Sequence, residues 1–291
     1  MKTQLQKAHA FRVLHERNRA FILPNPWNRG TAQLLAQLGF EALATTSAGY
    51  AFSRGVLDGQ VGREAMLAHV TELTEATDLP VSGDLENGYA HEPDGVAETI
   101  RRAAACGLVG GSIEDATGND SDPIYELSYA AERIQAAAEA AHALPFPFVL
   151  CARAENFLHG RPDLKDTIMR LQAFQQAGAD VLYAPGLTRR EEIATVIREV
   201  NRPVNVLVGM PGLDLTLEEL SALGVRRLST GSALARAAFG RFLVAAKEML
   251  TSGTFGFVNE AASTSRDLAP LLHAFLQSRR EADEAQGAVR Q

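Results

Sequence analysis

The sequence predicts an α/β fold in which eight parallel strands close into a (β/α)8 barrel of the TIM type, followed by an extra C-terminal helix. Two observations lead to this prediction. Short, β-rich apolar runs alternate with helix-patterned segments about eight times along the chain. Several helical segments also end at a glycine shortly before the next expected strand, which is typical of a helix closed by a left-handed residue. An eightfold series within 291 residues favours a barrel over a doubly wound sheet.

The expected strands are rich in apolar and β-branched residues. They cover Phe21 to Leu23, Ala42 to Thr46, Pro80 to Asp84, Gly110 to Glu114, Phe148 to Arg153, Asp180 to Ala184, Pro203 to Val208 and Arg226 to Thr230. The glycines that end the preceding helices are Gly39, Gly107, Gly178 and Gly224. Each of these glycines marks a passage from a helix into a strand.

The chain is expected to form a single domain over residues 1–291. Apolar residues make up 46% of it and are spread evenly, without the compositional change that marks a linker. Residues 1–18 are patterned as an N-terminal helix, and residues 244–291 as C-terminal helices and a tail. The resulting prediction is one barrel with helical additions at both ends.

The charge pattern limits the classes of partner. The chain carries 28 basic and 35 acidic side chains, a net charge of −7, with neither sign gathered into a long block. Nucleic acid is therefore not an expected partner, and no apolar stretch approaches the roughly 20 residues of a membrane span. The two cysteines, Cys106 and Cys151, cannot form a disulfide framework. A cytoplasmic location is expected.

Acidic side chains stand where two neighbouring strands end. Asp84 and Glu86 are separated by one residue, so a strand directs both to the same face, and Glu114 ends the next strand along the chain. Parallel neighbouring strands would bring the three carboxylates together at the mouth that carries chemistry in barrel enzymes. Oxygen ligands of this kind suit a hard cation such as Mg²⁺.

Arg153 closes an apolar strand and is the candidate for binding a substrate carboxylate. An arginine can hold a carboxylate through two parallel charge-assisted hydrogen bonds. A plainer interpretation, in which Arg153 pairs with Glu155, stays open. For Asp115, a helix cap and a metal ligand are equal alternatives, and Trp27 is either a packed aromatic near the mouth or a substrate contact.

Five motifs together resemble the phosphoenolpyruvate mutase and isocitrate lyase superfamily. They are Thr45-Thr46-Ser47-Ala48-Gly49, Gly55-Val56-Leu57-Asp58, Asp84-Leu85-Glu86-Asn87-Gly88-Tyr89, Ser112-Ile113-Glu114-Asp115 and Ala152-Arg153-Ala154-Glu155. Members of this family are modified barrels that bind magnesium and an α-oxyacid anion. They make or break carbon–carbon or carbon–phosphorus bonds beside a 2-oxo carboxylate.

The resemblance implies a role for each matched position. Asp84 would be the main metal carboxylate, with Asp58, Glu86 and Glu114 holding the Mg²⁺ (or Mn²⁺) or its waters. The catalytic residues would be Asp58 and Arg153, and Ser47, Ala48 and Arg153 would bind substrate. Trp27 near the mouth and Asn205 on a strand are further substrate-binding candidates, from their positions in the sequence. The family usually has aspartate where this chain has Glu86, so direct and water-mediated metal contacts are both open there.

The loop after Glu114 bears on the reaction. The lyase branch carries a Lys-Lys-Cys-Gly-His run in this loop, whereas residues 115–125 contain no cysteine, lysine or histidine. The expected activity is therefore magnesium-dependent decarboxylation of an oxaloacetate-type acid, or retro-aldol cleavage of a small 2-oxo or 2-hydroxy di- or tricarboxylate. A phosphoenolpyruvate or phosphonopyruvate mutase or hydrolase is one alternative, and a non-catalytic binder of 2-oxo acids is another.

The same loop and the C-terminal helices lead to two further expectations. Gly118, Asn119 and Asp120 lie in a polar, flexible segment that is expected to act as a lid over bound substrate. Family members often exchange a terminal helix between subunits, so the resemblance implies a homo-oligomer, either a dimer or a tetramer.

Overall fold

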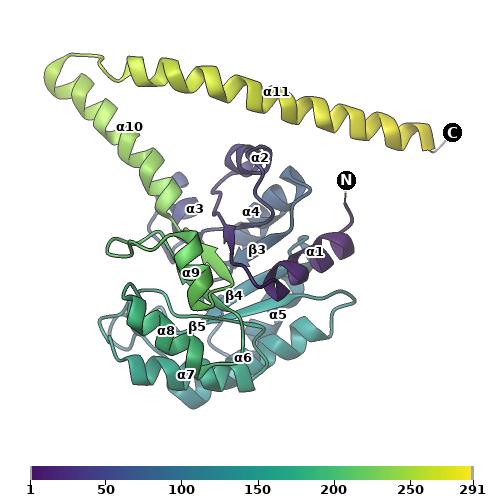
Figure 1. Cartoon of the computed structure of the whole chain (residues 1–291), viewed down its shortest axis with the longest axis vertical. Coiled ribbons are helices and arrows are strands. Elements are labelled where there is room, and N and C mark those ends of the chain that lie inside the picture. Colours follow the sequence, from purple (N-terminus) through teal and green to yellow (C-terminus); the bar gives the residue numbers. More distant parts are fainter. Residues whose placement is uncertain (1, 290–291) are drawn as a thin grey trace.

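A computed structural model describes residues 2–289 of the chain, and its centre is one eight-stranded parallel sheet (Figure 1). The strand order is β1-β8-β7-β6-β5-β4-β3-β2. The strands are β1 (Phe21–Leu23), β2 (Leu43–Ala44), β3 (Val81–Asp84), β4 (Gly110–Glu114), β5 (Val149–Arg153), β6 (Val181–Tyr183), β7 (Val204–Leu207) and β8 (Arg227–Ser229). All eight expected strands are confirmed, and none of their ends differs by more than two residues.

The sheet curves into a nearly closed (β/α)8 barrel, as predicted. Strand β1 pairs with β8, which brings the two ends of the series together. The remaining gap lies between β1 and β2. It is bridged by the Ala44 amide, which donates to the Pro24 carbonyl at 3.1 Å, and by Asn25 Nδ2, which donates to the Thr45 carbonyl at 2.7 Å. Closure at this seam therefore depends on the segments that follow the two strands.

Helices surround the barrel and continue beyond it. They are α1 (Gln4–Glu16), α2 (Arg29–Gln37), α3 (Ser47–Ser53), α4 (Arg63–Ala76), α5 (Pro93–Ala105), α6 (Leu127–His142), α7 (Leu164–Gln176), α8 (Arg190–Glu199), α9 (Leu217–Leu223), α10 (Ala233–Ser252) and α11 (Val258–Val289). The larger core cluster lies between the strands and the surrounding helices. None of the helices in the described part is long and apolar enough to span a membrane.

Helix α1 covers the N-terminal end of the barrel. Thr3 begins it with a capping box, in which the Thr3 side chain accepts from the Gln6 amide. Phe11 is fully buried and packs edge-on against Phe21 of β1, with ring centroids 6.3 Å apart. A Cβ atom at Gly110 would lie 2.8 Å from the Phe11 ring, so the first position of β4 must be glycine for α1 to pack here.

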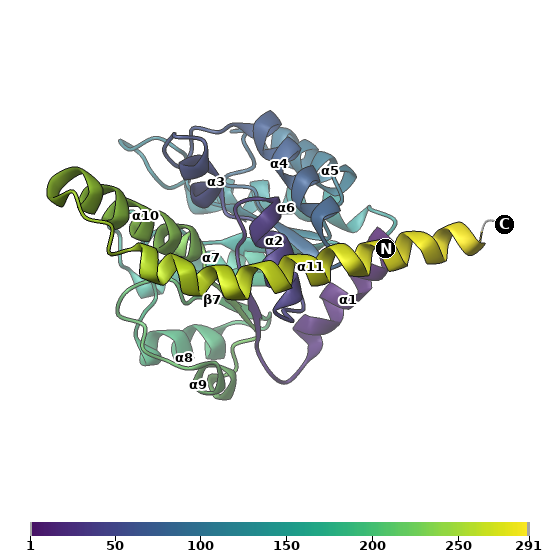
Figure 2. The ribbon, with the colours of Figure 1, turned by 90° about the horizontal axis from the view of Figure 1, so that it is seen from above.

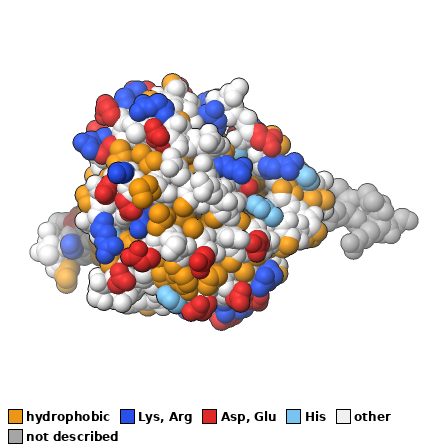
Figure 3. All heavy atoms as spheres, turned by 90° about the horizontal axis from the view of Figure 1, so that it is seen from below, with side chains coloured by type: hydrophobic (Ala, Val, Ile, Leu, Met, Phe, Trp, Pro, Cys, Tyr) orange, Lys and Arg blue, Asp and Glu red, His pale blue; other side chains and the backbone are white. Residues whose placement is uncertain are grey.

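Helices α10 and α11 form an arm that leaves the barrel (Figure 1). The expected C-terminal helices are present, but α10 begins at Ala233, before the predicted residue 244. Gly253, at φ 65°, ends α10 in the left-handed conformation that glycine adopts without strain. Helix α11 then crosses above the barrel and packs against α2 (Figure 2). On the face shown in Figure 3, acidic and basic side chains lie interspersed.

Candidate active site

A cavity of about 160 Å³ opens at the C-terminal ends of the strands. Half of the predicted site residues line it, drawn from strands β3, β5 and β7 and from the segments after β2. Its lining includes Ser47, Ala48, Asp58, Asp84, Arg153 and Asn205. Residues far apart in the sequence therefore meet at the mouth where barrel enzymes place their chemistry.

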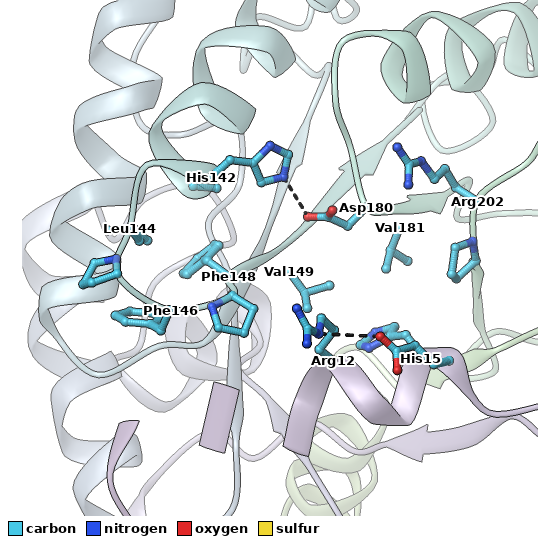
Figure 4. A pocket seen from close by; sticks show the side chains of 15 residues that line it. Arg12, His15, His142, Leu144, Phe146, Phe148, Val149, Asp180, Val181 and Arg202 are labelled. Atoms are coloured by element: carbon cyan, nitrogen blue, oxygen red, sulfur yellow. Dashed lines mark hydrogen bonds and ion pairs between the residues drawn. The ribbon is translucent and has the colours of Figure 1, made fainter. Parts of the chain in front are cut away.

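A larger cavity, of about 570 Å³, lies at the opposite end of the barrel, before strands β5, β6 and β7 begin. Figure 4 shows Arg12 and His15 of α1 facing His142 and Asp180 across it. Asp180 accepts from the Leu150 amide at 2.8 Å, and His142 Nε2 lies 3.4 Å from it, so this carboxylate is already bonded. Of the predicted carboxylates, Asp58 and Asp84 line the smaller cavity instead.

Asp84 ends β3 and is held from three sides. Its Oδ2 atom accepts hydrogen bonds from the Ser47 amide and the Ser47 hydroxyl, both at 2.9 Å. Its Oδ1 atom accepts from Arg153 Nη1 at 2.8 Å, and its amide donates to Thr45 Oγ1 at 2.8 Å. The segment that begins α3, which was predicted to bind substrate oxygens, therefore binds Asp84 in this structure.

Arg153 ends β5 at the centre of a ring of carboxylates. Its Nη1 atom lies 2.8 Å from Asp84 and 3.1 Å from Glu114, and its Nε atom lies 2.8 Å from Glu155. Its guanidinium also lies over the Tyr183 ring, 5.3 Å from the centroid. The pairing with Glu155 that was left open is present, but it is one of three ion pairs that share a single cation.

The carboxylates around Arg153 are crowded, and their pKa values reflect this. Burial, followed by the charge of Asp84, raises the pKa of Asp58. Burial, followed by the charges of Asp84 and Asp58, raises the pKa of Glu86 to about 7. Burial raises the pKa of Glu114 well above its ordinary value, against the attraction of Arg153. The site thus brings together more carboxyl groups than Arg153 alone can pair with.

Glu86 follows β3 in a backbone conformation that side chains rarely adopt. Its φ is 49°, and that of Tyr89 is 54°. Such left-handed positions cost about 1–3 kcal/mol each and cluster at functional sites. Tyr89 Oη donates to Glu86 Oε1 at 3.3 Å, so the turn directs this carboxylate beside the phenol. The predicted proximity of Glu86 to the other carboxylates is reflected in its raised pKa.

The loop after β4 is anchored at its base and exposed at its tip. Ala116 and Ile124 form an antiparallel bridge, whereas Gly118, Asn119 and Asp120 are exposed. Asn87 Nδ2 donates to the Thr117 carbonyl at 3.3 Å, which joins the loop to the turn after β3. The predicted lid residues thus lie at the tip of a loop with a fixed base.

Asp115 anchors the structure around this loop. Its Oδ1 atom accepts from the Glu155 amide at 2.8 Å, and its Oδ2 atom accepts from Arg170 Nη1 at 3.1 Å. Arg170 also donates to the Tyr125 carbonyl at 2.9 Å. Both oxygens of Asp115 are therefore engaged with protein groups.

The donor set suits a hard cation. Within residues 2–289, no group of three or more His, Cys, Asp or Glu side chains is already spaced to hold a metal ion. Mg²⁺, however, is commonly held by only one or two carboxylates and keeps several waters. The excess of carboxylate oxygens beside Asp84 fits this requirement, because a cation would relieve their mutual repulsion.

Some positions differ from the sequence-based interpretation. Trp27 is half-buried and packs beside Gly49, where a Cβ added to the glycine would lie 3.3 Å from the Trp27 Cβ. Trp27 is not one of the residues that line the cavity in the described part of the chain. Arg227, from β8, does line the cavity and was missed. The alternation of faces along a strand, which places Arg227 and Ser229 on the same side of β8, was the signal that could have found it.

The barrel carries carboxylates and an arginine at its C-terminal mouth, where barrel enzymes place their catalytic residues. Residues 11–250 match the family model described as phosphoenolpyruvate phosphomutase, and the chain belongs to this family. An oxaloacetate decarboxylase of Paraburkholderia xenovorans is 29% identical over 70% of this chain and 68% of its own length. A 2-methylisocitrate lyase of Shewanella oneidensis is 27% identical over 84% of this chain and 86% of its own.

Solved structures agree with this assignment. A protein of Burkholderia cenocepacia J2315, proposed to be a lyase or mutase, is 60% identical, with a TM-score of 0.90 over 93% of this chain and 97% of its own. A phosphonopyruvate hydrolase in complex with oxalate and Mg²⁺ has a TM-score of 0.81 and 22% identity, covering 98% of this chain and 99% of its own, and it shares the fold.

Proposed function

We propose that this protein is a magnesium-dependent lyase that cleaves a carbon–carbon bond next to a 2-oxo carboxylate. The reaction is decarboxylation of an oxaloacetate-type acid or retro-aldol cleavage of a small di- or tricarboxylate. One observation carries the proposal: Arg153 lies among carboxylates at the barrel mouth, bonded to Asp84 at 2.8 Å. A metal and a substrate carboxylate can bind at such a site by separating this pair.

The residues present fit Mg²⁺, with Mn²⁺ as a substitute. Asp84 would hold the metal, and Asp58, Glu86 and Glu114 would hold it or its waters. When bound, Mg²⁺ would act as a Lewis acid that stabilises negative charge on the 2-oxo oxygen as the adjacent bond breaks. The charge excess around Asp84 is the property of this chain that supports metal binding.

The chain's own residues would orient the substrate. Once Asp84 and Glu114 turn to the metal, Arg153 Nη1 is free to bind the substrate carboxylate, in a position fixed by Glu155, which bonds Nε at 2.8 Å. The Ser47 amide and hydroxyl donate to Asp84 in this structure. They would be released by the same movement of Asp84 and could then donate to substrate oxygens. The small cavity limits water around the breaking bond.

Relatives with named activities support this reaction class. Oxaloacetate decarboxylases and 2-methylisocitrate lyases both match most of this chain. The exposed loop after β4 carries acidic residues and lacks the cysteine of the typical lyases, so solvent or another group would supply the proton.

A substrate panel tests the proposal. The full chain is assayed with Mg²⁺ and oxaloacetate, 2-methylisocitrate, isocitrate or phosphonopyruvate, and the released 2-oxo acid is measured by reduction with a dehydrogenase. We expect turnover of a carboxylate substrate, loss of turnover on chelation, and loss in Asp84→Asn. Turnover of phosphonopyruvate alone would instead assign the chain to the second candidate.

That second candidate is a phosphonopyruvate or phosphoenolpyruvate mutase or hydrolase. It is supported by the family model and by the shared fold of phosphonopyruvate hydrolase. The acidic loop with Asp120 and Asp122 opposes it, because carboxylates repel a transferring phosphoryl group. Oxalate binding without turnover of any panel member would indicate a non-catalytic 2-oxo acid binder.

We also propose a homo-oligomer assembled through the arm. Helices α10 and α11 expose large apolar side chains that a second copy would cover, among them Phe242, Leu243, Met249 and Leu250. Leu250 is 87% exposed. Light scattering should give a multiple of the 31.3 kDa chain mass for the full chain, and a smaller particle for the double variant Phe242→Asp/Leu250→Asp.

A further inference from the structure

The wall of the active-site cavity contains a second arginine whose charge is not neutralised. Arg227 of β8 is 3% exposed and lines the same cavity as Asp84 and Arg153. Its Nε atom donates to Asn205 Oδ1 at 2.9 Å, whereas its buried Nη1 atom has no hydrogen-bond partner. Among the described residues, no Asp or Glu oxygen lies within 4.0 Å of its guanidinium nitrogens.

The two cavity arginines differ sharply in their surroundings. Arg153 is bonded to three carboxylates, while the side chains bonded to Arg227 are the neutral amide of Asn205 and the thiol of Cys151. Burial raises the pKa of the Cys151 thiol, so that side chain stays uncharged. Buried charges in proteins are normally paired, because an unpaired ion loses its hydration without compensation. Arg227 thus has no counter-ion among the described residues.

The cavity beside Arg227 is polar and has room for a small acid. Hydroxyl groups of Thr45, Ser82, Ser112 and Ser229 line it together with the Asn205 amide. Asn205 Nδ2 donates to Ser229 Oγ at 2.9 Å, and Arg227 Nε can only donate, so the orientation of the amide is determined. The volume of about 160 Å³ is roughly five times the ~30 Å³ share of a water molecule.

We propose that Arg227 binds the second anionic group of a small dianionic substrate, whose first carboxylate binds at Arg153 beside the metal that Asp84 would hold. This inference rests on the proposed function and names its substrate class: 2-oxo or 2-hydroxy diacids with a short chain between the two anionic groups. Asn205 acts as a positioning residue that holds the Arg227 guanidinium from one side. Monoacids fill only half of the site and leave the buried cation unpaired.

The subsite also discriminates between the two reactions. In a decarboxylation of the distal group, that carboxylate must become neutral CO₂, so an arginine that binds it stabilises the ground state and slows the reaction. In a retro-aldol cleavage of a 2-hydroxy diacid, the C2 hydroxyl loses its proton and becomes the 2-oxo oxygen as the C2–C3 bond breaks. The electron pair stays on C3, which takes up a proton, and the distal carboxylate keeps its charge. Arg227 therefore favours retro-aldol cleavage.

Calorimetry with Mg²⁺ and two non-cleaved probes tests the proposal. Oxalate occupies only the end at Arg153, whereas 3,3-difluorooxaloacetate also carries a distal carboxylate. For Arg227→Met we expect at least about tenfold weaker binding of difluorooxaloacetate and an oxalate affinity within about twofold of the wild type, because a charge-assisted hydrogen bond is lost at the distal end alone. The affinity of Arg227→Lys for difluorooxaloacetate should lie between those of the wild type and Arg227→Met. Arg226→Met is the matched control, because Arg226 bonds backbone carbonyls beside it, and should change neither affinity.

Equal weakening of both probes, or no change in either, would overturn the proposal. A wild-type measurement covers the case in which Arg227→Met does not fold. The 4-methyl ester of difluorooxaloacetate, which lacks the distal charge, should bind at least about tenfold more weakly than the diacid, and equal affinities would refute the subsite. If the wild type binds neither oxalate nor the diacid with Mg²⁺, the proposed function itself fails, which is a different result.

Discussion

Replacing Arg153 by methionine should leave the carboxylates around it without their shared cation. The Arg153 side chain is 14% exposed, and its three partners, at 2.8 to 3.1 Å, are between 4% and 18% exposed. Removing one partner of a buried ion pair costs about 3–5 kcal/mol, because the remaining charge stays desolvated. We expect Arg153→Met to lower the free energy of unfolding by this amount near neutral pH, measured by urea denaturation at one fixed protein concentration.

Magnesium should restore part of this loss. Since a cation can take the place of the guanidinium among the carboxylates, the urea midpoint of Arg153→Met should rise with Mg²⁺ more than that of the wild type. Arg102→Met removes an arginine that pairs with Glu64 at 2.6 Å on the surface, and it should change neither the midpoint nor the response to Mg²⁺. A variant as stable as the wild type without metal would refute the view that Arg153 neutralises the cluster.

Two further predictions concern other parts of the chain. Burial lowers the pKa of His69 to about 4 from its ordinary 6.5. The unfolded chain therefore binds more protons between these values, so about 3 kcal/mol of stability, complete above pH 6.5, is lost as the pH falls toward 4. His69→Phe, which can keep the stacking on Tyr50, should lose less stability on acidification, and an identical pH profile would count against this. The exposed loop at residues 118–122 should be cut by protease more slowly when Mg²⁺ and oxalate are bound, whereas an unchanged cleavage rate would argue against a lid.

The barrel was predictable because its signals are local. Each strand is a short apolar run, and glycines such as Gly224, at φ 104°, end the helices where expected. The arm was harder to place. The apolar character of α10 continues without a break from Ala233, so the pattern alone could not show where the barrel helix ends and the arm begins.

The grouping of several candidate residues was predictable, whereas their contacts were not. Asp84, Arg153 and Ser47 meet as expected, since the ends of parallel strands converge at one mouth. The sharing of Arg153 among three carboxylates depends on side-chain rotamers and on register across neighbouring strands, which single-strand patterns do not encode. Arg227 was missed because an arginine, by residue type alone, indicates a solvated side chain, and only its place on the same face of β8 as Ser229 could have indicated otherwise.

Metal-dependent anion binding at Asp84 is the central requirement of the proposed function. Calorimetric titration of oxalate into the full chain, with and without Mg²⁺, measures it, with Asp84→Asn as the test variant and Asp122→Asn on the exposed loop as the control. We predict that oxalate binds the wild type and Asp122→Asn only when Mg²⁺ is present, and that Asp84→Asn fails to bind it. Equal affinity without metal, or undiminished binding by Asp84→Asn, would contradict the account.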